Sequence, residues 1–233
     1  MSGLDVLLVG GTGVISTAVA HRAVEVGHRV TLLNRGKTDE RPVPDGAEVL
    51  QADVRDPESV RAVLAGRRFD AVADFIAFTP DHVRLALDQF RGRTDQYVFI
   101  SSASAYQKPP ARLPILESTP LRNPFWQYSR DKIACEDLLM HAYRTDGFPA
   151  TVVRPSHTYD RTKLPTLGGW TDIHRMRQGL PVLVHGDGTS LWTLTHAVDF
   201  AVAFTGLLGR PQAIGESYTI TSDEFLPWDQ IYR

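Results

Sequence analysis

The first two thirds of the chain alternate short apolar runs with segments whose apolar residues recur at helical spacing. The apolar runs predict strands at 5–9, 29–33, 47–51, 69–76, 96–100 and 150–155. The helical spacing predicts helices at about 14–26, 56–65, 81–90 and 124–144. Repeated strand–helix units are typical of an α/β fold with a parallel, doubly wound sheet of the Rossmann type.

The pattern is less regular after Pro155. It predicts a helix that ends at Arg177, short strands at 181–184 and 190–194, a helix at 197–208, a strand at 216–220 and a helix that starts at 227. We therefore expect a Rossmann domain over residues 1–155 and a small lobe over residues 156–233, interleaved with the last sheet strands. Because the last helix stops after two turns without a C-cap, we expect the chain to be truncated.

A glycine-rich turn, Gly10-Gly-Thr-Gly13-Val-Ile-Ser16, joins the first predicted strand to the first predicted helix. A strand, a glycine turn, a helix and a second strand are the context that a dinucleotide site requires. Glycines let the backbone turn tightly and approach a pyrophosphate at the helix N-terminus. The turn predicts such a site, and an ordinary strand-to-helix turn is the alternative.

The residues after the second predicted strand bear on the type of cofactor. An acidic residue there would bind the ribose 2′-hydroxyl of NAD, but this chain has Asn34-Arg35-Gly36-Lys37. Arg35 could bind a 2′-phosphate, and no carboxylate is present to repel one. The sequence therefore slightly favours NADP, with NAD as the alternative if Arg35 and Lys37 belong to a solvated loop.

Tyr128 and Lys132 are four residues apart and lie on one face of the helix predicted at 124–144. The lysine charge can lower the pKa of the tyrosine from about 10, which would let Tyr128 exchange a proton near neutral pH. A serine cluster, 101–104, follows the fifth predicted strand, where ligands of open parallel sheets bind. The alternatives are a solvated helix face and serines that form a turn.

Composition excludes several classes of protein. The chain has 25 Lys and Arg against 27 Asp and Glu, which argues against nucleic acid or a membrane surface as its partner. The sequence has no apolar run of about 20 residues, and the single cysteine, Cys135, suits a reducing cytosol. Because the N-terminus leads directly into a predicted strand, we expect no signal peptide. We expect a cytoplasmic protein without a metal site, because the eight histidines lack metal-ligand spacing.

These motifs make the chain similar to the extended short-chain dehydrogenases/reductases of the NAD(P)-dependent epimerase/dehydratase family. The shared features, in order, are Gly10-x-x-Gly13-x-x-Ser16, Asp53 after the third strand, Ser102 four residues before Tyr106, Tyr128-x-x-x-Lys132 and Arg154-Pro155. The resemblance covers nearly all of the chain. It implies that residues 1–155 bind NAD(P) and that residues 156–233 bind a small-molecule substrate.

The resemblance also implies roles for single residues. Tyr128 would be the general acid/base, Lys132 would bind the nicotinamide ribose, and Ser102 would hold the substrate oxygen. The residues expected along the cofactor are Gly10, Gly13, Val14, Ile15, Asn34, Arg35, Asp53, Val54, Phe75, Ile76, Ala77, Ser101, Tyr128, Lys132 and Pro155. Asp53 would contact the adenine amino group. A homodimer would form through the helices at 81–90 and 124–144.

The implied reaction is hydride transfer at a carbon that bears a hydroxyl or keto group, with a nucleotide-linked sugar as the first candidate substrate. Two departures from sugar-nucleotide members are the apolar segment 75–78, without their asparagine, and Trp192, in place of an arginine that binds the substrate pyrophosphate. Arg154 or Lys163 could supply that contact. The alternatives are an NADP-dependent ketone reductase with a smaller substrate and a non-catalytic dinucleotide sensor or RNA-associated protein.

Overall fold

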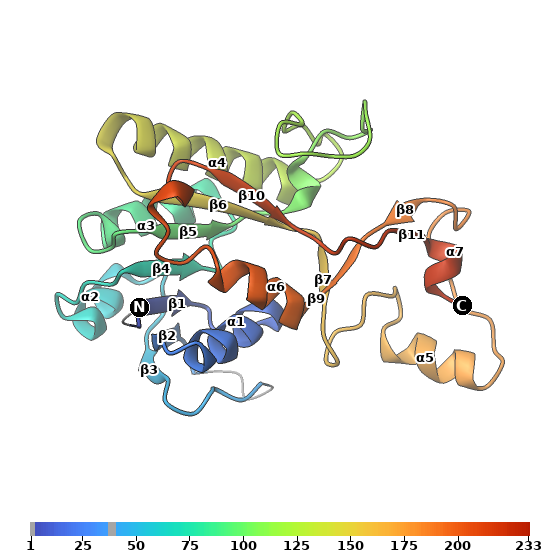
Figure 1. Cartoon of the computed structure of the whole chain (residues 1–233), viewed down its shortest axis with the longest axis horizontal. Helices are drawn as coiled ribbons and strands as arrows, with labels where there is room; N and C mark the ends of the chain where they lie inside the picture. The colour runs from blue at the N-terminus through green and yellow to red at the C-terminus, as the bar shows by residue number, and fades with distance from the viewer. Residues whose placement is uncertain (1–2, 37–40) are drawn as a thin grey trace.

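A seven-stranded parallel sheet forms the centre of the molecule, as the computed structural model shows for residues 3–36 and 41–233 (Figure 1). Its strands are β1 (Asp5–Val9), β2 (Arg29–Asn34), β3 (Glu48–Gln51), β4 (Ala71–Asp74), β5 (Tyr97–Ile100), β6 (Ala150–Pro155) and β10 (Ser217–Ile220). They lie in the order β10-β6-β5-β4-β1-β2-β3, and every neighbouring pair is parallel. The predicted Rossmann-type fold is confirmed.

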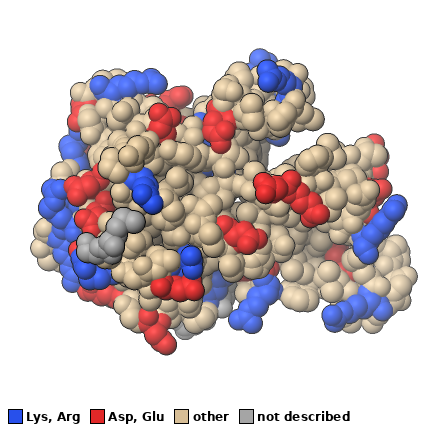
Figure 2. Space-filling model, viewed as in Figure 1, with Lys and Arg blue, Asp and Glu red and all other residues tan. Residues whose placement is uncertain are grey.

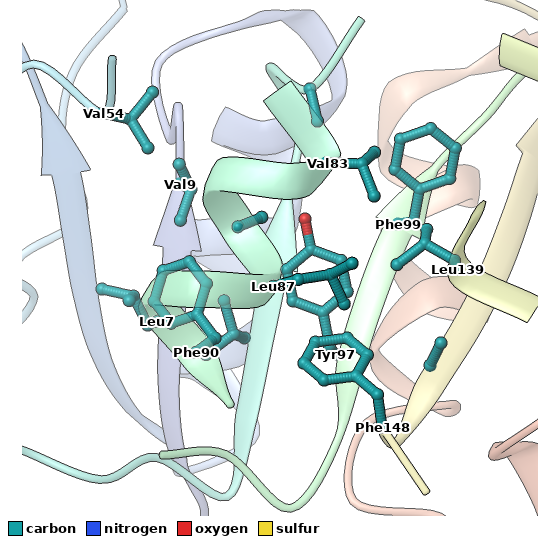
Figure 3. Packing of buried hydrophobic residues seen from close by; sticks show 14 of the residues in the cluster. Leu7, Val9, Val54, Val83, Leu87, Phe90, Tyr97, Phe99, Leu139 and Phe148 are labelled. Carbon is teal, nitrogen blue, oxygen red and sulfur yellow. The ribbon is translucent and has the colours of Figure 1, made fainter. Parts of the chain in front are cut away.

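Helices cover both faces of the sheet. On one face lie α2 (Pro57–Leu64), α3 (Pro80–Phe90) and α4 (Gln127–Asp146), and on the other lie α1 (Val14–Glu25) and α6 (Ala197–Thr205). Alternate strand residues face the two layers, since Leu7 packs in the α2–α4 layer and Leu8 packs in the α1–α6 layer. Figure 3 shows the first core, where Phe90, Tyr97 and Phe148 pack together.

Local signals in the sequence explain where these elements begin. Asp56 caps α2, because its carboxylate accepts hydrogen bonds from the backbone N–H groups of Glu58 and Ser59 at 3.1 and 3.3 Å. Pro57 then occupies the first helical position, where a missing N–H costs nothing. Helix α4 ends at a glycine. Gly147, at its C-terminal end, adopts φ = 68°, a left-handed conformation that ends the helix and favours glycine.

Residues beyond β6 build a smaller lobe, which Figure 1 shows beside the sheet. It contains β7 (His157–Tyr159), α5 (Trp170–Arg177), β8 (Leu191–Trp192), β9 (Leu194–His196), β11 (Leu226–Pro227) and α7 (Trp228–Ile231). Strand β7 pairs with β9, and β8 pairs with β11. The ring of Trp228 is buried between those of His185 and Trp192, at centroid distances of 4.2 and 5.6 Å. This aromatic cluster is the core of the lobe.

The strand predicted at 181–184 is wrong, because this segment has no strand partner in the structure. Its apolar residues follow the glycine at the end of α5 and run as irregular backbone. The short strands β7 and β11 are not predicted, since two or three residues carry no alternation that distinguishes a strand.

The surface carries both signs of charge. Figure 2 shows acidic and basic side chains interspersed over the face that it displays. Among residues 3–36 and 41–233, no helix combines the length and apolarity needed to cross a membrane.

Cys135 is expected to be inert towards thiol reagents while the protein is folded. Its side chain is buried in α4, and burial raises the pKa of the thiol to about 12, whereas the thiolate is the reactive form. We predict no labelling by a disulfide reagent at pH 8 and one equivalent of labelling in denaturant, since Cys135 is the single cysteine. Thr145→Cys, which adds an exposed thiol to the same helix, is the control that labels at once. Rapid labelling of the unchanged protein in buffer would contradict the burial of this thiol.

Candidate active site

A cavity of about 550 Å³ lies at the carboxyl ends of β1, β2 and β4. The strand order reverses here, because β1 lies between β4 and β2, and ligands of open α/β sheets bind at such a switch point. The lining residues are Gly10, Thr12, Gly13, Val14, Ile15, Ser16, Leu33, Asn34, Arg35, Gly36, Val43, Val49, Ala52, Val54, Phe75, Ile76, Phe78 and Lys163.

The glycine turn forms the floor of this cavity and is held by side-chain hydrogen bonds. Ser16 donates to the Gly10 carbonyl at 2.7 Å and accepts from the Gly13 N–H at 2.8 Å. The Asn34 amide oxygen accepts from the Gly11 N–H at 2.9 Å. Gly10 has φ = 84°, and a Cβ there would lie 2.4 Å from a methyl carbon of Ile76, so only glycine fits. This cradle fits the backbone approach that a dinucleotide pyrophosphate requires.

Asp74, at the end of β4, fixes the next wall of the cavity. One carboxylate oxygen accepts from the N–H groups of Ile76 and Ala77, both at 2.9 Å, and the other accepts from the Tyr97 hydroxyl at 2.8 Å. Burial, with the charge of Asp74, holds the pKa of Tyr97 well above its usual value, so Tyr97 stays a donor. Asp74 is not among the predicted site residues, although a buried acid at a strand end is a signal for one.

Asp53 and Val54 follow β3, as predicted, but only one of the two lines the cavity. Val54 lines the cavity, whereas the Asp53 carboxylate accepts from the Arg55 N–H at 3.0 Å. Arg55 in turn donates to the Ile76 carbonyl at 2.5 Å. The segment after β3 is thereby attached to the segment after β4, and the adenine contact of Asp53 stays a prediction.

Lys132 projects from α4 into the interior between β4 and β5. Its side chain is buried, and its ammonium donates to the Ala77 and Ile100 carbonyls at 2.7 and 2.6 Å. Burial lowers the pKa of Lys132 to about 8. Lys132 therefore links the segment after β4 to the end of β5, and its contact with a ribose stays a prediction.

Tyr128 stands one helical turn before Lys132, and Phe78 connects it to the cavity. Phe78 lines the cavity, and its ring centroid lies 6.5 Å from that of Tyr128. Burial raises the pKa of Tyr128, and a hydrogen bond from Ser102 opposes this shift without reversing it. The predicted net lowering of the Tyr128 pKa by Lys132 is wrong here, because burial of the phenol dominates the shift, while the ammonium donates to backbone carbonyls.

Ser102 belongs to a row of hydrogen-bonded hydroxyls that the sequence does not predict. The hydroxyls of Ser102 and Ser104 lie 2.9 Å apart, and Ser129 donates to Ser104 at 2.8 Å. The amide of Asn123 donates to Ser129 at 3.2 Å and to the Ser104 carbonyl at 2.8 Å. These contacts, which are partly buried except for the buried one between Asn123 and Ser129, hold the Ser102 side chain beside Tyr128. Ser129 directly follows Tyr128 on α4, which is the signal that points to it.

Arg154 lies in the core and not in a substrate site. Its guanidinium makes a salt bridge of 2.6 Å with Glu136, in which the two side chains are only 6% and 4% exposed, and it also donates to the Tyr106 hydroxyl at 3.0 Å. The suggestion that Arg154 binds a substrate phosphate is therefore wrong. Ser101, expected along the cofactor, donates its hydroxyl to Glu136, so its side chain has no hydrogen left for a ligand.

The structure brings most of the predicted cofactor residues together around one cavity. Those that line it are Gly10, Gly13, Val14, Ile15, Asn34, Arg35, Val54, Phe75 and Ile76. Ala77 is buried and accepts a hydrogen bond from Lys132 through its carbonyl, and Pro155 ends β6 opposite Ile220 of β10. Lys37 lies outside the described residues. Within the described part of the chain, no three His, Cys, Asp or Glu side chains gather as a metal site would require.

The chain belongs to the NAD-dependent epimerase/dehydratase family, whose model matches residues 6–92 and 82–221. The proteins that this chain resembles include UDP-sugar epimerases, a reductase and a dehydratase. The matched region holds the glycine turn, the serine row and the Tyr128–Lys132 pair described above.

Three curated proteins illustrate the range of its relatives. The chain is 28% identical to a chloroplast stem-loop binding protein of 41 kDa from Arabidopsis thaliana over 98% of this chain and 61% of that protein. It is 27% identical to 2'-dehydrokanamycin reductase of Streptomyces kanamyceticus over 99% of this chain and 65% of that protein. It is 32% identical to UDP-glucose 4-epimerase of Streptomyces lividans over 63% and 50%. The chain thus spans less than two thirds of the length of these relatives.

Solved structures agree with the fold. An epimerase from Methanothermobacter thermautotrophicus has a TM-score of 0.84 and 18% identity, over 99% of this chain and 75% of that one. A dTDP-glucose 4,6-dehydratase from Bacillus anthracis, in complex with NAD, has a TM-score of 0.83 and 18% identity, over 99% and 79%. At such identity the likeness concerns the fold alone.

Proposed function

We propose that this protein transfers hydride between a nicotinamide dinucleotide and a carbon bearing a hydroxyl or keto group, with Tyr128 as the acid/base. The observation that carries the proposal is the continuity of the site. The cavity above the glycine turn extends to Phe78, whose ring packs beside Tyr128, and Ser102 lies within hydrogen-bonding reach of that phenol.

A dinucleotide, when bound, supplies or accepts the hydride. The chain's own residues handle the proton and the orientation. The Tyr128 phenol donates a proton to a keto oxygen or takes one from a hydroxyl, and Ser102 holds the same oxygen by a hydrogen bond. Since burial raises the pKa of Tyr128, it favours the protonated phenol, which is the form that acts as a proton donor in reduction.

For the cofactor we propose NADP, with NAD as the close alternative. Arg35 lines the cavity at the end of β2, where the ribose 2′ position lies in this fold, and no acidic side chain is found among the described lining residues. A guanidinium there suits a 2′-phosphate better than a 2′-hydroxyl. NAD is nonetheless bound by solved members of the same fold.

For the substrate we propose a nucleotide-linked sugar that undergoes epimerisation or dehydration, as several relatives are UDP-sugar epimerases. In that reaction the hydride returns to the substrate and no net redox change occurs. Within the lobe, Trp192 is 41% exposed and donates its indole N–H to His157 at 2.9 Å. Because an indole is neutral, Trp192 cannot make the charged contact with a diphosphate that an arginine makes.

A net ketone reductase is the second candidate, and the length of one alignment supports it, although the stem-loop binding protein aligns over a similar length. The relative named as a reductase aligns with 99% of this chain, whereas the UDP-glucose epimerases align with 63–65%. The neutral Trp192 and the exposed rings of Phe78 and Trp126 beside Tyr128 suit an uncharged or ring-shaped substrate.

Two measurements distinguish these candidates. Mass spectrometry of the nucleotide that copurifies tests retention of the cofactor, and absorbance at 340 nm during turnover of UDP-sugars and small ketones tests net redox change. Retained oxidised cofactor and constant absorbance support the epimerase when the product is a sugar isomer, and the dehydratase when the product has lost the elements of water. Stoichiometric consumption of NADPH supports the reductase. Absence of turnover with every nucleotide-linked sugar and every ketone would contradict the proposal.

We also propose a homodimer through α3 and α4, which pack side by side on one layer. Light scattering tests it, and a monomer at micromolar concentration would exclude it.

A further inference from the structure

Of the described residues that line the cavity, two carry a positive charge. Arg35 comes from the end of β2, and Lys163 comes from the turn after β7, about 130 residues later in the chain. Lys163 thus reaches the cavity from outside the Rossmann domain. A dinucleotide carries a pyrophosphate that needs cationic or N–H partners.

The turn that carries Lys163 is built around one carboxylate. Asp160 accepts hydrogen bonds from the N–H of Thr162 at 2.7 Å, from the hydroxyl of Thr162 at 2.6 Å and from the N–H of Lys163 at 2.9 Å. The hydrogen bonds from Thr162 lower the pKa of Asp160 although burial opposes this, so the carboxylate is charged at neutral pH. The backbone around Lys163 is therefore fixed.

Arg41 attaches this turn to the glycine turn. Its guanidinium makes a salt bridge of 3.2 Å with Asp160, donates to the Thr162 hydroxyl and donates to the Thr12 carbonyl at 3.4 Å. The Arg41 and Asp160 side chains are only 13% and 16% exposed. Thr12 lies between the glycines that approach the pyrophosphate, so the Lys163 turn is held next to that part of the cavity.

We propose that Lys163 binds the pyrophosphate of the dinucleotide and that Asp160 and Arg41 position it. This inference rests on the proposed function, because it needs a dinucleotide in the cavity. Arg35 serves the opposite, ribose 2′ end, so the two cations have separate partners. Lys163 is a suitable phosphate ligand, since an ammonium acts as a mobile point charge. The same geometry makes Lys163 a cofactor residue and not a substrate residue.

The test compares Lys163→Met with Arg161→Met, titrating each with NADP⁺ and NAD⁺ by calorimetry. Both variants remove one positive charge, but Arg161 is exposed two residues away and does not line the cavity. We expect Lys163→Met to lower the binding affinity for both dinucleotides about tenfold, because the variant loses one charge-assisted hydrogen bond. Arg161→Met should change affinity by less than about twofold.

Several outcomes would overturn the inference. Equal affinities of Lys163→Met and Arg161→Met would do so, and so would a loss confined to NADP⁺, which would assign Lys163 to the 2′-phosphate. Weakened binding of UDP with unchanged binding of dinucleotides would assign Lys163 to the substrate. An unchanged protein that is folded yet binds neither dinucleotide would overturn the proposed function itself, and this inference with it.

The positioning role of Asp160 has its own readout. Asp160→Asn should weaken dinucleotide binding about threefold, and it should add almost nothing in a Lys163→Met background, because its effect passes through Lys163. Additive losses in the double variant would show that Asp160 acts on the fold and not through the lysine. Thermal unfolding of each variant checks that the protein remains folded.

Discussion

Tyr128→Phe is expected to lower the rate of hydride transfer by about 10²- to 10⁴-fold, the range that general acid/base catalysis contributes. The variant loses only the hydroxyl, whose proton the reaction needs, and keeps the ring that packs against Phe78 and Trp126. Dinucleotide affinity should stay within about threefold of the unchanged protein, since the glycine turn and Arg35 are untouched. The measurement is single-turnover kinetics with the substrate found by the screen above.

Tyr143→Phe is the matched control for this variant. Tyr143 lies on the same helix, α4, but it is exposed near the far end, where its ring packs against Gly215. The rate of hydride transfer of the Tyr143→Phe variant should equal that of the unchanged protein. Turnover retained by Tyr128→Phe would show that another group moves the proton, and loss of both activity and dinucleotide binding would show a structural role instead.

Arg154→Met is expected to lower the free energy of unfolding by about 3–5 kcal/mol, because it leaves the Glu136 carboxylate buried without its partner. The guanidinium bonds of Arg154 join β6 to α4 and to Tyr106, and Tyr106 meets Thr219 of β10 at 2.6 Å. Burial opposes the charge of Arg154, but hydrogen bonding to Glu136 raises the pKa of Arg154 overall, so the guanidinium stays charged. Urea denaturation measures the change.

Two further variants make the stability prediction specific. Adding Glu136→Leu to Arg154→Met removes the stranded charge, so the double variant should be more stable than Arg154→Met alone. Arg91→Met breaks a solvent-exposed salt bridge of 3.1 Å with Asp146 and should cost about 1 kcal/mol or less. A loss of similar size for Arg91→Met and Arg154→Met would contradict the importance of burial.

The parallel sheet and its helices could be predicted because their signals are local. Strand β1 is a continuous apolar run, the glycine turn follows it at once, and Asp56-Pro57 marks the start of α2. The grouping of Gly10, Asn34 and Phe75 around one cavity could also be predicted, since the carboxyl ends of parallel strands share one edge.

Contacts between distant residues could not be predicted from this single sequence. The Asp74–Tyr97 and Glu136–Arg154 pairs join separate elements, and no local pattern states that these side chains meet in the core. For the same reason the orientation of Lys132 towards backbone carbonyls was not predicted, and the sign of the Tyr128 pKa shift was wrong. Burial decides that sign, and burial depends on the whole fold.

Titration of the purified protein with NADPH and NADH, followed by the fluorescence of the reduced nicotinamide, tests the central claim most directly. We predict saturable binding of one dinucleotide per chain, tighter for NADPH, and release by the matching oxidised dinucleotide. A folded protein that holds no copurified nucleotide and shows no saturable binding of either dinucleotide would contradict the claim that the cavity above the glycine turn is the cofactor site of an enzyme.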